Sequence, residues 1–153
     1  VVTEYDASIG AILATRRRRS PEEAEVWAAH IAVVEGECVG SGGFETDRAR
    51  FIGRGRQLRS PLATSGGPVQ TGAIGTVLDP IFSLTRCVRL APGSTARVAF
   101  WTLVAPSRDA VLDLVDQHRD APAFDRAATT HFGGLRNTKE PGCRLKRRPR
   151  TPS

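Results

Sequence analysis

One short segment of the 153-residue sequence gathers side chains that could bind a polar ligand. Residues 44–56 read FETDRARFIGRGR and combine two acidic residues, four arginines, two phenylalanines and two glycines. Arginine forks hold hydroxyl, carboxylate or phosphate groups at two points, and carboxylates accept hydrogen bonds from paired hydroxyls. Glycine lets the backbone approach a ligand closely, and an aromatic ring such as Phe51 offers a flat apolar face to a sugar. This mixture favours recognition of a sugar or a phosphate over recognition of DNA.

The same segment also has a plainer interpretation. Mixed charges in a glycine-rich stretch are typical of a solvated surface loop or of a salt-bridge network. The chemistry of these residues alone leaves the two interpretations open.

The other residue types that commonly carry chemistry are scattered along the chain. They are His30, His118, His131, Cys38, Cys87 and Cys143. Their spacing matches neither a catalytic Ser/His/Asp or Cys/His arrangement nor a CxxC metal site or disulfide framework. We expect His30 to be a hydrogen-bonded core residue, and the cysteines to be reduced thiols of a cytoplasmic segment. We expect no catalytic residue, metal or cofactor in this chain.

The net charge of +6 is carried entirely by one end of the chain. Residues 136–153 contain seven of the 22 Lys and Arg residues and one acidic residue, whereas residues 1–135 are neutral overall. The stretch LKRRPR could bind nucleic acid or act as a localisation signal, but it has no interleaved aromatic side chain for base stacking. We therefore expect a disordered basic tail over residues 131–153 and no nucleic-acid partner. No apolar run is long enough to span a membrane, and no signal peptide opens the sequence.

The pattern of apolar residues predicts strands in the first two thirds of the chain. Residues 9–15, IGAILAT, are predicted as a strand. Residues 20–35 are ambiguous, because SPEE is typical of a helix start whereas the valines and Trp27 favour a strand. Residues 40–75 are rich in Gly, Ser, Pro and Arg and predict a long irregular segment.

The clearest predicted hairpin lies further along. Residues 81–90 and 94–105 alternate in hydropathy and are joined by the Pro-Gly turn APGST at residues 91–95, so we expect them to pair with each other. Ser107 is expected to cap a helix on which Val111, Leu114, Val115 and His118 share one face. A second short helix is predicted over residues 122–130.

Several blocks of the sequence, taken in order, resemble a known family. They are LATRRRRS, VWAAH, FETDRARFIGRGR, TGAIGTVLDPIFSL, VRLAPG and ARVAFWTLVAPSR. Together they resemble the sandwich domain of cyclic β-1,2-glucan synthases, which those enzymes share with inverting glycoside phosphorylases such as cellobiose and chitobiose phosphorylase. The resemblance covers residues 3 to about 128.

The resemblance implies a mainly β fold, namely an antiparallel β-sandwich (supersandwich) followed by a helical linker to an (α/α)6 barrel. It favours a strand within residues 20–35. The implied organisation is a partial sandwich over residues 1–105, the start of the linker over residues 106–130, and the basic tail over residues 131–153.

The resemblance also implies a function. The barrel of such enzymes splits a β-glucosidic bond with phosphate and inversion, while other domains of the synthases polymerise and cyclise glucose. No position here matches the catalytic acid, so the expected role is a non-catalytic, carbohydrate-associated sandwich domain. Because sandwich loops of the phosphorylases can lie over an active site, the candidate sugar or phosphate contacts are Glu45, Asp47, Arg48, Phe51 and Arg54. A purely structural module that braces the barrel or a dimer interface is the alternative.

The partners expected from the resemblance belong to the parent enzyme. They are a β-glucan or glucose and phosphate, the barrel, and a second copy in a homodimer; the parent enzyme would be associated with the inner membrane. Residues 129–153 depart from the family, and Met is absent throughout. We expect a truncated or frame-shifted piece of a longer protein, with open sheet edges and an exposed apolar face.

Overall fold

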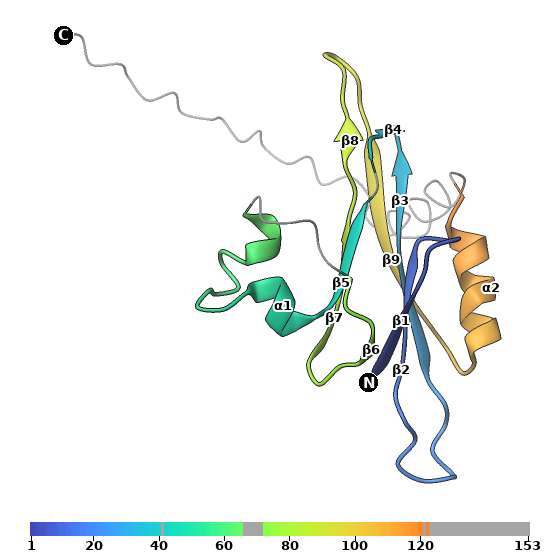
Figure 1. Ribbon diagram of the computed structural model, residues 1–153. Coiled ribbons are helices and arrows are strands. Elements are labelled where there is room, and N and C mark those ends of the chain that lie inside the picture. Colours follow the sequence, from blue (N-terminus) through green and yellow to red (C-terminus); the bar gives the residue numbers. More distant parts are fainter. Residues whose placement is uncertain (41, 66–71, 121, 123–153) are drawn as a thin grey trace, which may run out of the picture.

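The chain forms a mainly β structure, seen here in a computed structural model that describes residues 1–40, 42–65, 72–120 and 122 (Figure 1). The strands are β1 (Val2–Asp6), β2 (Ala11–Thr15), β3 (Trp27–Glu35), β4 (Glu37–Cys38), β5 (Gly43–Asp47), β6 (Gly75–Thr76), β7 (Pro80–Thr85), β8 (Val88–Arg89) and β9 (Arg97–Ala105). The helices are α1 (Arg48–Ile52), the short 3-10 helix η1 (Leu62–Thr64) and α2 (Arg108–His118). All strand pairs among the described residues are antiparallel, as the predicted sandwich requires.

Five strands form the main sheet in the order β6-β1-β2-β3-β9. The ladder between β3 and β9 is the longest, running from the pair Trp27–Ala105 to the pair Glu35–Arg97. Two smaller sheets, β4–β8 and β5–β7, complete the described strands.

One face of the main sheet is covered by α2 (Figure 1). Along β3, Ala29, Ile31 and Val33 are buried on this face, because side chains alternate between the two faces of a strand. Val111 and Val115 of α2 are fully buried against them. Burial of each of these valines contributes about 1.5–3 kcal/mol to folding. The predicted cap is confirmed, since the Ser107 side chain accepts a hydrogen bond from the Ala110 backbone N–H.

The other face of the main sheet contacts the β5–β7 pair. Tyr5 of β1 stacks on Phe44 of β5 with ring centroids 3.9 Å apart. His30 of β3 stacks on Phe82 of β7 at 5.4 Å. The main sheet therefore lies between α2 on one side and a second, smaller sheet on the other.

The expectation for His30 is confirmed in its hydrogen bond but not in its burial, because His30 is not one of the buried core residues. Its Nδ1 lies 2.9 Å from the Thr102 hydroxyl, and its ring also stacks on Phe100 at 6.0 Å. The imidazole is half-buried. Loss of solvation by burial lowers the pKa of His30 below its ordinary value of 6.5, and a backbone hydrogen bond with Trp101 opposes that shift.

The predicted hairpin of residues 81–90 with 94–105 is wrong. β9 pairs with β3 over its whole length, and the stretch 81–90 is divided into β7, which pairs with β5, and β8, which pairs with β4. The boundary between β7 and β8 lies at Arg86, whose guanidinium donates hydrogen bonds to the Thr85 and Gly10 carbonyl oxygens. Alternation predicts a strand correctly but does not identify its partner.

Other predictions have mixed outcomes. The strand within 9–15 is confirmed as β2, and the ambiguity at 20–35 resolves to the strand β3 preceded by a turn at Ser20–Glu23. The irregular segment predicted over residues 40–75 is partly wrong, because it contains β5, α1 and η1. The short helix predicted over 122–130 lies outside the described residues except for Pro122, and the tail 131–153 lies outside them entirely.

The expected exposed apolar face is present on β9. Val98, Phe100 and Val104 are 45%, 54% and 59% exposed, and they lie on the side of β9 opposite α2. β9 is also an end strand of the main sheet, so within the described residues its outer edge has no neighbouring strand. Exposed apolar edge strands promote association between chains.

Replacing Val98 and Val104 with threonine should reduce concentration-dependent self-association in sedimentation velocity. Threonine keeps the β-branched shape that strands favour, so the free energy of unfolding should change by less than about 0.5 kcal/mol. The matched control is Val33→Thr, on the buried face at 7% exposure, which should destabilise the fold by about 1–3 kcal/mol. Unchanged association in the double variant would contradict the role given to this face.

The lowered pKa of His30 predicts a dependence of stability on pH. In the unfolded chain the His30 imidazole binds a proton near pH 6.5, whereas in the folded chain it binds a proton only at a lower pH. The stability associated with neutral His30 is therefore present above about pH 6.5 and is lost as the pH falls through the lowered folded pKa. His30→Gln, which can still hydrogen-bond to Thr102, should show a smaller fall in Tm between pH 7 and pH 5 than the unmodified chain. An identical fall in both chains would refute this assignment.

Candidate functional site

The acidic–arginine loop, residues 44–56, begins on β5 and continues into α1. β5 pairs with β7, and the register shifts between Glu45, which pairs with Ser83, and Asp47, which pairs with Pro80. Such a bulge ends regular pairing and redirects the chain. The helix α1 starts directly after it, at Arg48.

Glu45 lies inside the structure and not on the loop surface. The residue is 3% exposed, and its Oε1 accepts hydrogen bonds from the backbone N–H groups of Thr46 and Asp47, both at 2.9 Å. The carboxylate therefore satisfies two backbone donors at the bulge that the β-ladder leaves without partners. In this position Glu45 shapes the loop.

Asp47 is the N-cap of α1. Its Oδ1 accepts from the backbone N–H of Ala49 at 2.8 Å and of Arg50 at 3.4 Å. A cap of this kind contributes about 0.5–2 kcal/mol to helix stability. Like Glu45, Asp47 uses its carboxylate to hold the backbone of the loop.

Gly53 ends α1 and brings the next turn close to it. Its φ is +83°, a conformation that favours glycine, and a Cβ added here would lie 2.8 Å from the Leu62 Cβ. Further along the loop, the Arg56 guanidinium donates to the Ser65 hydroxyl at 2.8 Å. The far end of the loop is thus fixed against η1.

The remaining three predicted residues face outward to different degrees. The Arg48 guanidinium lies 3.4 Å from an Asp79 carboxylate oxygen, and the two side chains are 40% and 65% exposed. Such an exposed pair contributes about 0–1 kcal/mol, so it can be exchanged for a ligand at little cost. Phe51 is half-buried one helical turn after Arg48. Arg54 is exposed and makes no ion pair within the described part of the chain.

The structure therefore divides the five candidates into two groups. The carboxylates of Glu45 and Asp47 bind backbone N–H groups of the loop. In contrast, Arg48, Phe51 and Arg54 are at least partly accessible to solvent, on α1 or just after it. The sequence pattern gave these residues one common role and did not show this division.

Two positions that the sequence analysis missed support the loop. Thr46 is fully buried, and its hydroxyl donates to the Ala73 carbonyl at 2.6 Å and lies 2.8 Å from the Thr3 hydroxyl. The Asp79 carboxylate forms an ion pair with the Arg48 guanidinium, and the Asp79 carbonyl oxygen accepts a hydrogen bond from the Arg48 backbone N–H at 3.2 Å. Both residues stand in blocks that carry the family resemblance, Thr46 in FETDRARFIGRGR and Asp79 in TGAIGTVLDPIFSL, but the residue type of Thr46 does not indicate its burial.

The described residues contain neither a metal-binding cluster nor a membrane-spanning helix. Within residues 1–40, 42–65 and 72–120, no group of three or more His, Cys, Asp or Glu side chains is placed to hold a metal ion. The helices described there are too short and too polar to cross a bilayer. Cys38 and Cys87 are exposed free thiols.

Comparison with known proteins agrees with the architecture. Residues 1–121 match the family model of the glycosyl hydrolase 94 supersandwich domain. The cyclic beta-(1,2)-glucan synthase NdvB of Rhizobium meliloti (strain 1021) is 36% identical to the chain over 123 residues. That match covers 80% of this chain but only 4% of the relative, so the chain spans a small part of that protein's length.

The resemblance inferred from the sequence blocks is thereby confirmed, and so is the mainly antiparallel β fold. The matched region includes the acidic–arginine loop, the main sheet and α2. The chain belongs to the glycosyl hydrolase 94 supersandwich domain family.

Proposed function

We propose that this chain is a non-catalytic, carbohydrate-associated domain of an enzyme that synthesises or trims β-glucan, and that the acidic–arginine loop contacts the sugar. Family membership supports a carbohydrate context, and the relative named above is a cyclic beta-(1,2)-glucan synthase. Catalysis is assigned to other parts of the parent enzyme, in particular an (α/α)6 barrel.

One observation carries the proposal: Arg48, Phe51 and Arg54 are accessible on a loop whose backbone is already fixed by Glu45 and Asp47. A rigid loop loses little conformational entropy when it binds, which favours affinity. Two guanidinium groups can donate to sugar hydroxyls or to a phosphate, and a half-buried aromatic side chain can pack against the apolar face of a sugar ring.

A second candidate function is bracing, in which the domain only supports the barrel or a dimer interface. The exposed apolar side chains of β9 favour this role, because such surfaces are commonly covered by a partner. Here the arginines of the loop would be solvated and would contact no sugar. The homodimer and the inner-membrane association expected from the family also belong to this proposed parent enzyme.

The sugar-contact proposal predicts a localised response to β-1,2-linked glucan oligosaccharide. In amide ¹H–¹⁵N spectra of the full chain, resonances of residues 47–54 should shift in a saturable way. The double variant Arg48→Ala/Arg54→Ala should raise the Kd at least about tenfold, because a hydrogen bond from a charged donor contributes about 1.5 kcal/mol or more.

The matched control is Arg147→Ala/Arg148→Ala, which removes the same charge from the basic tail and should leave the Kd unchanged. Because neither Arg48 nor Arg54 is buried, the double variant should keep the dispersed spectrum of the folded chain. Dispersed resonances that do not move at any oligosaccharide concentration would reject sugar contact and favour bracing.

A further inference from the structure

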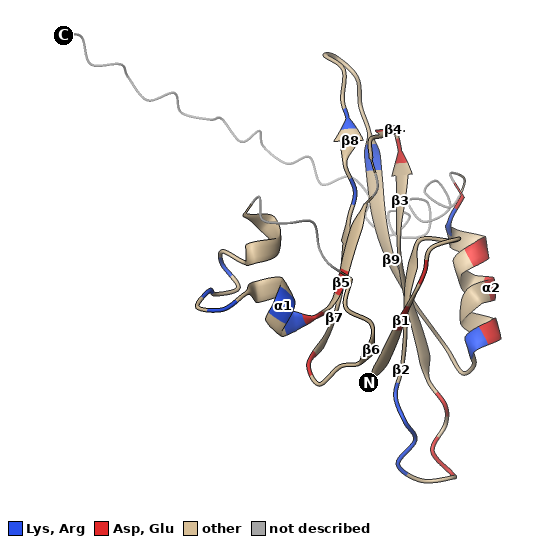
Figure 2. Cartoon of the chain, viewed as in Figure 1, with Lys and Arg blue, Asp and Glu red and all other residues tan. Residues whose placement is uncertain are grey.

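A second arginine-rich surface lies away from the acidic–arginine loop, at the connection between β2 and β3. Residues 16–26 form this connection, which projects beyond the end of the main sheet (Figure 1). Basic residues occupy the arm that leaves β2, and acidic residues occupy the arm that returns to β3 (Figure 2). We call residues 17–21 the arginine tip.

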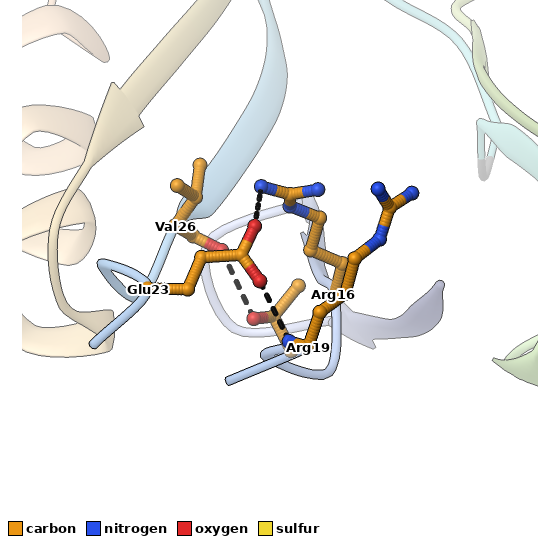
Figure 3. A network of polar contacts seen from close by, with 5 residues as sticks. Arg16, Arg19, Glu23 and Val26 are labelled. Carbon is orange, nitrogen blue, oxygen red and sulfur yellow. Dashed lines mark hydrogen bonds and ion pairs between the residues drawn. The ribbon is translucent and has the colours of Figure 1, made fainter. Parts of the chain in front are cut away.

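The base of this connection is braced by Glu23 (Figure 3). One oxygen of its carboxylate accepts from the Arg16 guanidinium, and the other accepts from the Arg19 backbone N–H at 2.6 Å. The Glu23 backbone N–H donates to the Ser20 carbonyl at 3.2 Å. The hydrogen bond to the Arg19 backbone is the main cause that lowers the pKa of Glu23, so the brace remains ionised at neutral pH.

The arginine tip carries a shallow, open hollow of about 420 Å³, lined by the exposed residues Arg17, Arg18, Arg19, Ser20 and Pro21. Within the described part of the chain, the three lining guanidinium groups have no carboxylate partner, unlike Arg16. Because the three guanidinium groups line the same hollow, their positive charges add there and attract an anion.

The acidic side chains of the connection do not fill this hollow. Glu23 is committed to Arg16 and the Arg19 backbone, and Glu25 accepts from the Trp27 indole N–H at 2.6 Å. Glu22 is exposed on the return arm and is not among the lining residues. The hollow therefore has an excess of positive charge although the whole connection is nearly neutral.

We propose that the arginine tip binds a phosphate group. Guanidinium groups bind phosphate oxygens in two-point geometry. Three guanidinium groups also offer more N–H donors than the two oxygens of a carboxylate ligand can accept, which favours phosphate over carboxylate. None of the lining residues is aromatic, which argues against stacking of nucleic-acid bases there. The phosphate belongs either to a free small molecule or to a lipid headgroup, and both present the same chemistry. This site is separate from the proposed sugar-contact loop and does not depend on it.

The first test is residue-resolved, because the basic tail also attracts anions. In amide ¹H–¹⁵N spectra of the full chain at constant ionic strength, inorganic phosphate should shift the resonances of residues 17–21 saturably, whereas chloride should not. The triple variant Arg17→Ala/Arg18→Ala/Arg19→Ala should weaken this response at least about tenfold. The control Lys146→Ala/Arg147→Ala/Arg148→Ala removes the same charge and should keep it.

A second variant separates specific geometry from net charge and from unfolding. Arg17→Lys/Arg18→Lys/Arg19→Lys keeps the charge but removes the forks, so phosphate binding should weaken although the spectrum stays dispersed. Equal binding by the lysine variant would show a diffuse charge effect and overturn the proposal. So would the absence of a saturable shift at residues 17–21 in the unmodified chain.

Co-sedimentation with phosphatidylglycerol vesicles distinguishes the two sources of phosphate. Vesicle binding that the arginine-tip alanine variant loses and the tail variant keeps would assign the site to a lipid headgroup. Phosphate-induced shifts without such vesicle binding would assign it to a free phosphate compound. Equal loss of both responses in the tip and tail variants would contradict a site at the tip.

Discussion

The packing of the main sheet against α2 depends on the nine-residue ladder that joins β3 to β9. The ladder brings together segments about seventy residues apart and creates a sheet surface wide enough for α2 to cover. Closing so long a loop has an entropic cost that grows only slowly with its length, so apolar burial against Val111 and Val115 can offset it. The same ladder leaves β9 at the end of the sheet, with an apolar face that α2 does not reach.

Both arginine-rich surfaces are built by one physical device, a carboxylate that binds backbone N–H groups. Glu45 and Asp47 do this beneath the acidic–arginine loop, and Glu23 does it at the base of the arginine tip. In each case the acid fixes the backbone, and nearby guanidinium groups remain accessible. Residues 1–135 are therefore neutral overall but form two surfaces that are locally basic. Both surfaces lie within residues 1–121, which match the family model, so the match does not distinguish between them.

Local patterns in the sequence predicted the elements better than their partners. The strand β2 and the capped helix α2 follow from apolar spacing and from Ser107, which are local signals. The partner of β9 does not follow from spacing, because two adjacent alternating segments predict a hairpin with each other. The pairing of β9 with β3 instead places both strands in the core that α2 covers. The strand β5 escaped prediction because its buried positions include Glu45 and Thr46, whose burial depends on hydrogen bonds that no hydropathy pattern records. For the site, the residue types indicated polar recognition, but the inward position of Glu45 could not be read from composition.

Amide hydrogen exchange of the full chain, measured for each residue in ¹H–¹⁵N spectra, tests the β3–β9 pairing most directly. If β9 pairs with β3 on one edge and has an open edge on the other, amides along Arg97–Ala105 should alternate between slow and fast exchange. The slow amides should exchange at rates similar to those of Val111 and Val115 in α2, because both depend on the same core. Uniformly fast exchange along β9, or protection shared with residues 81–90 and not with β3, would contradict the account.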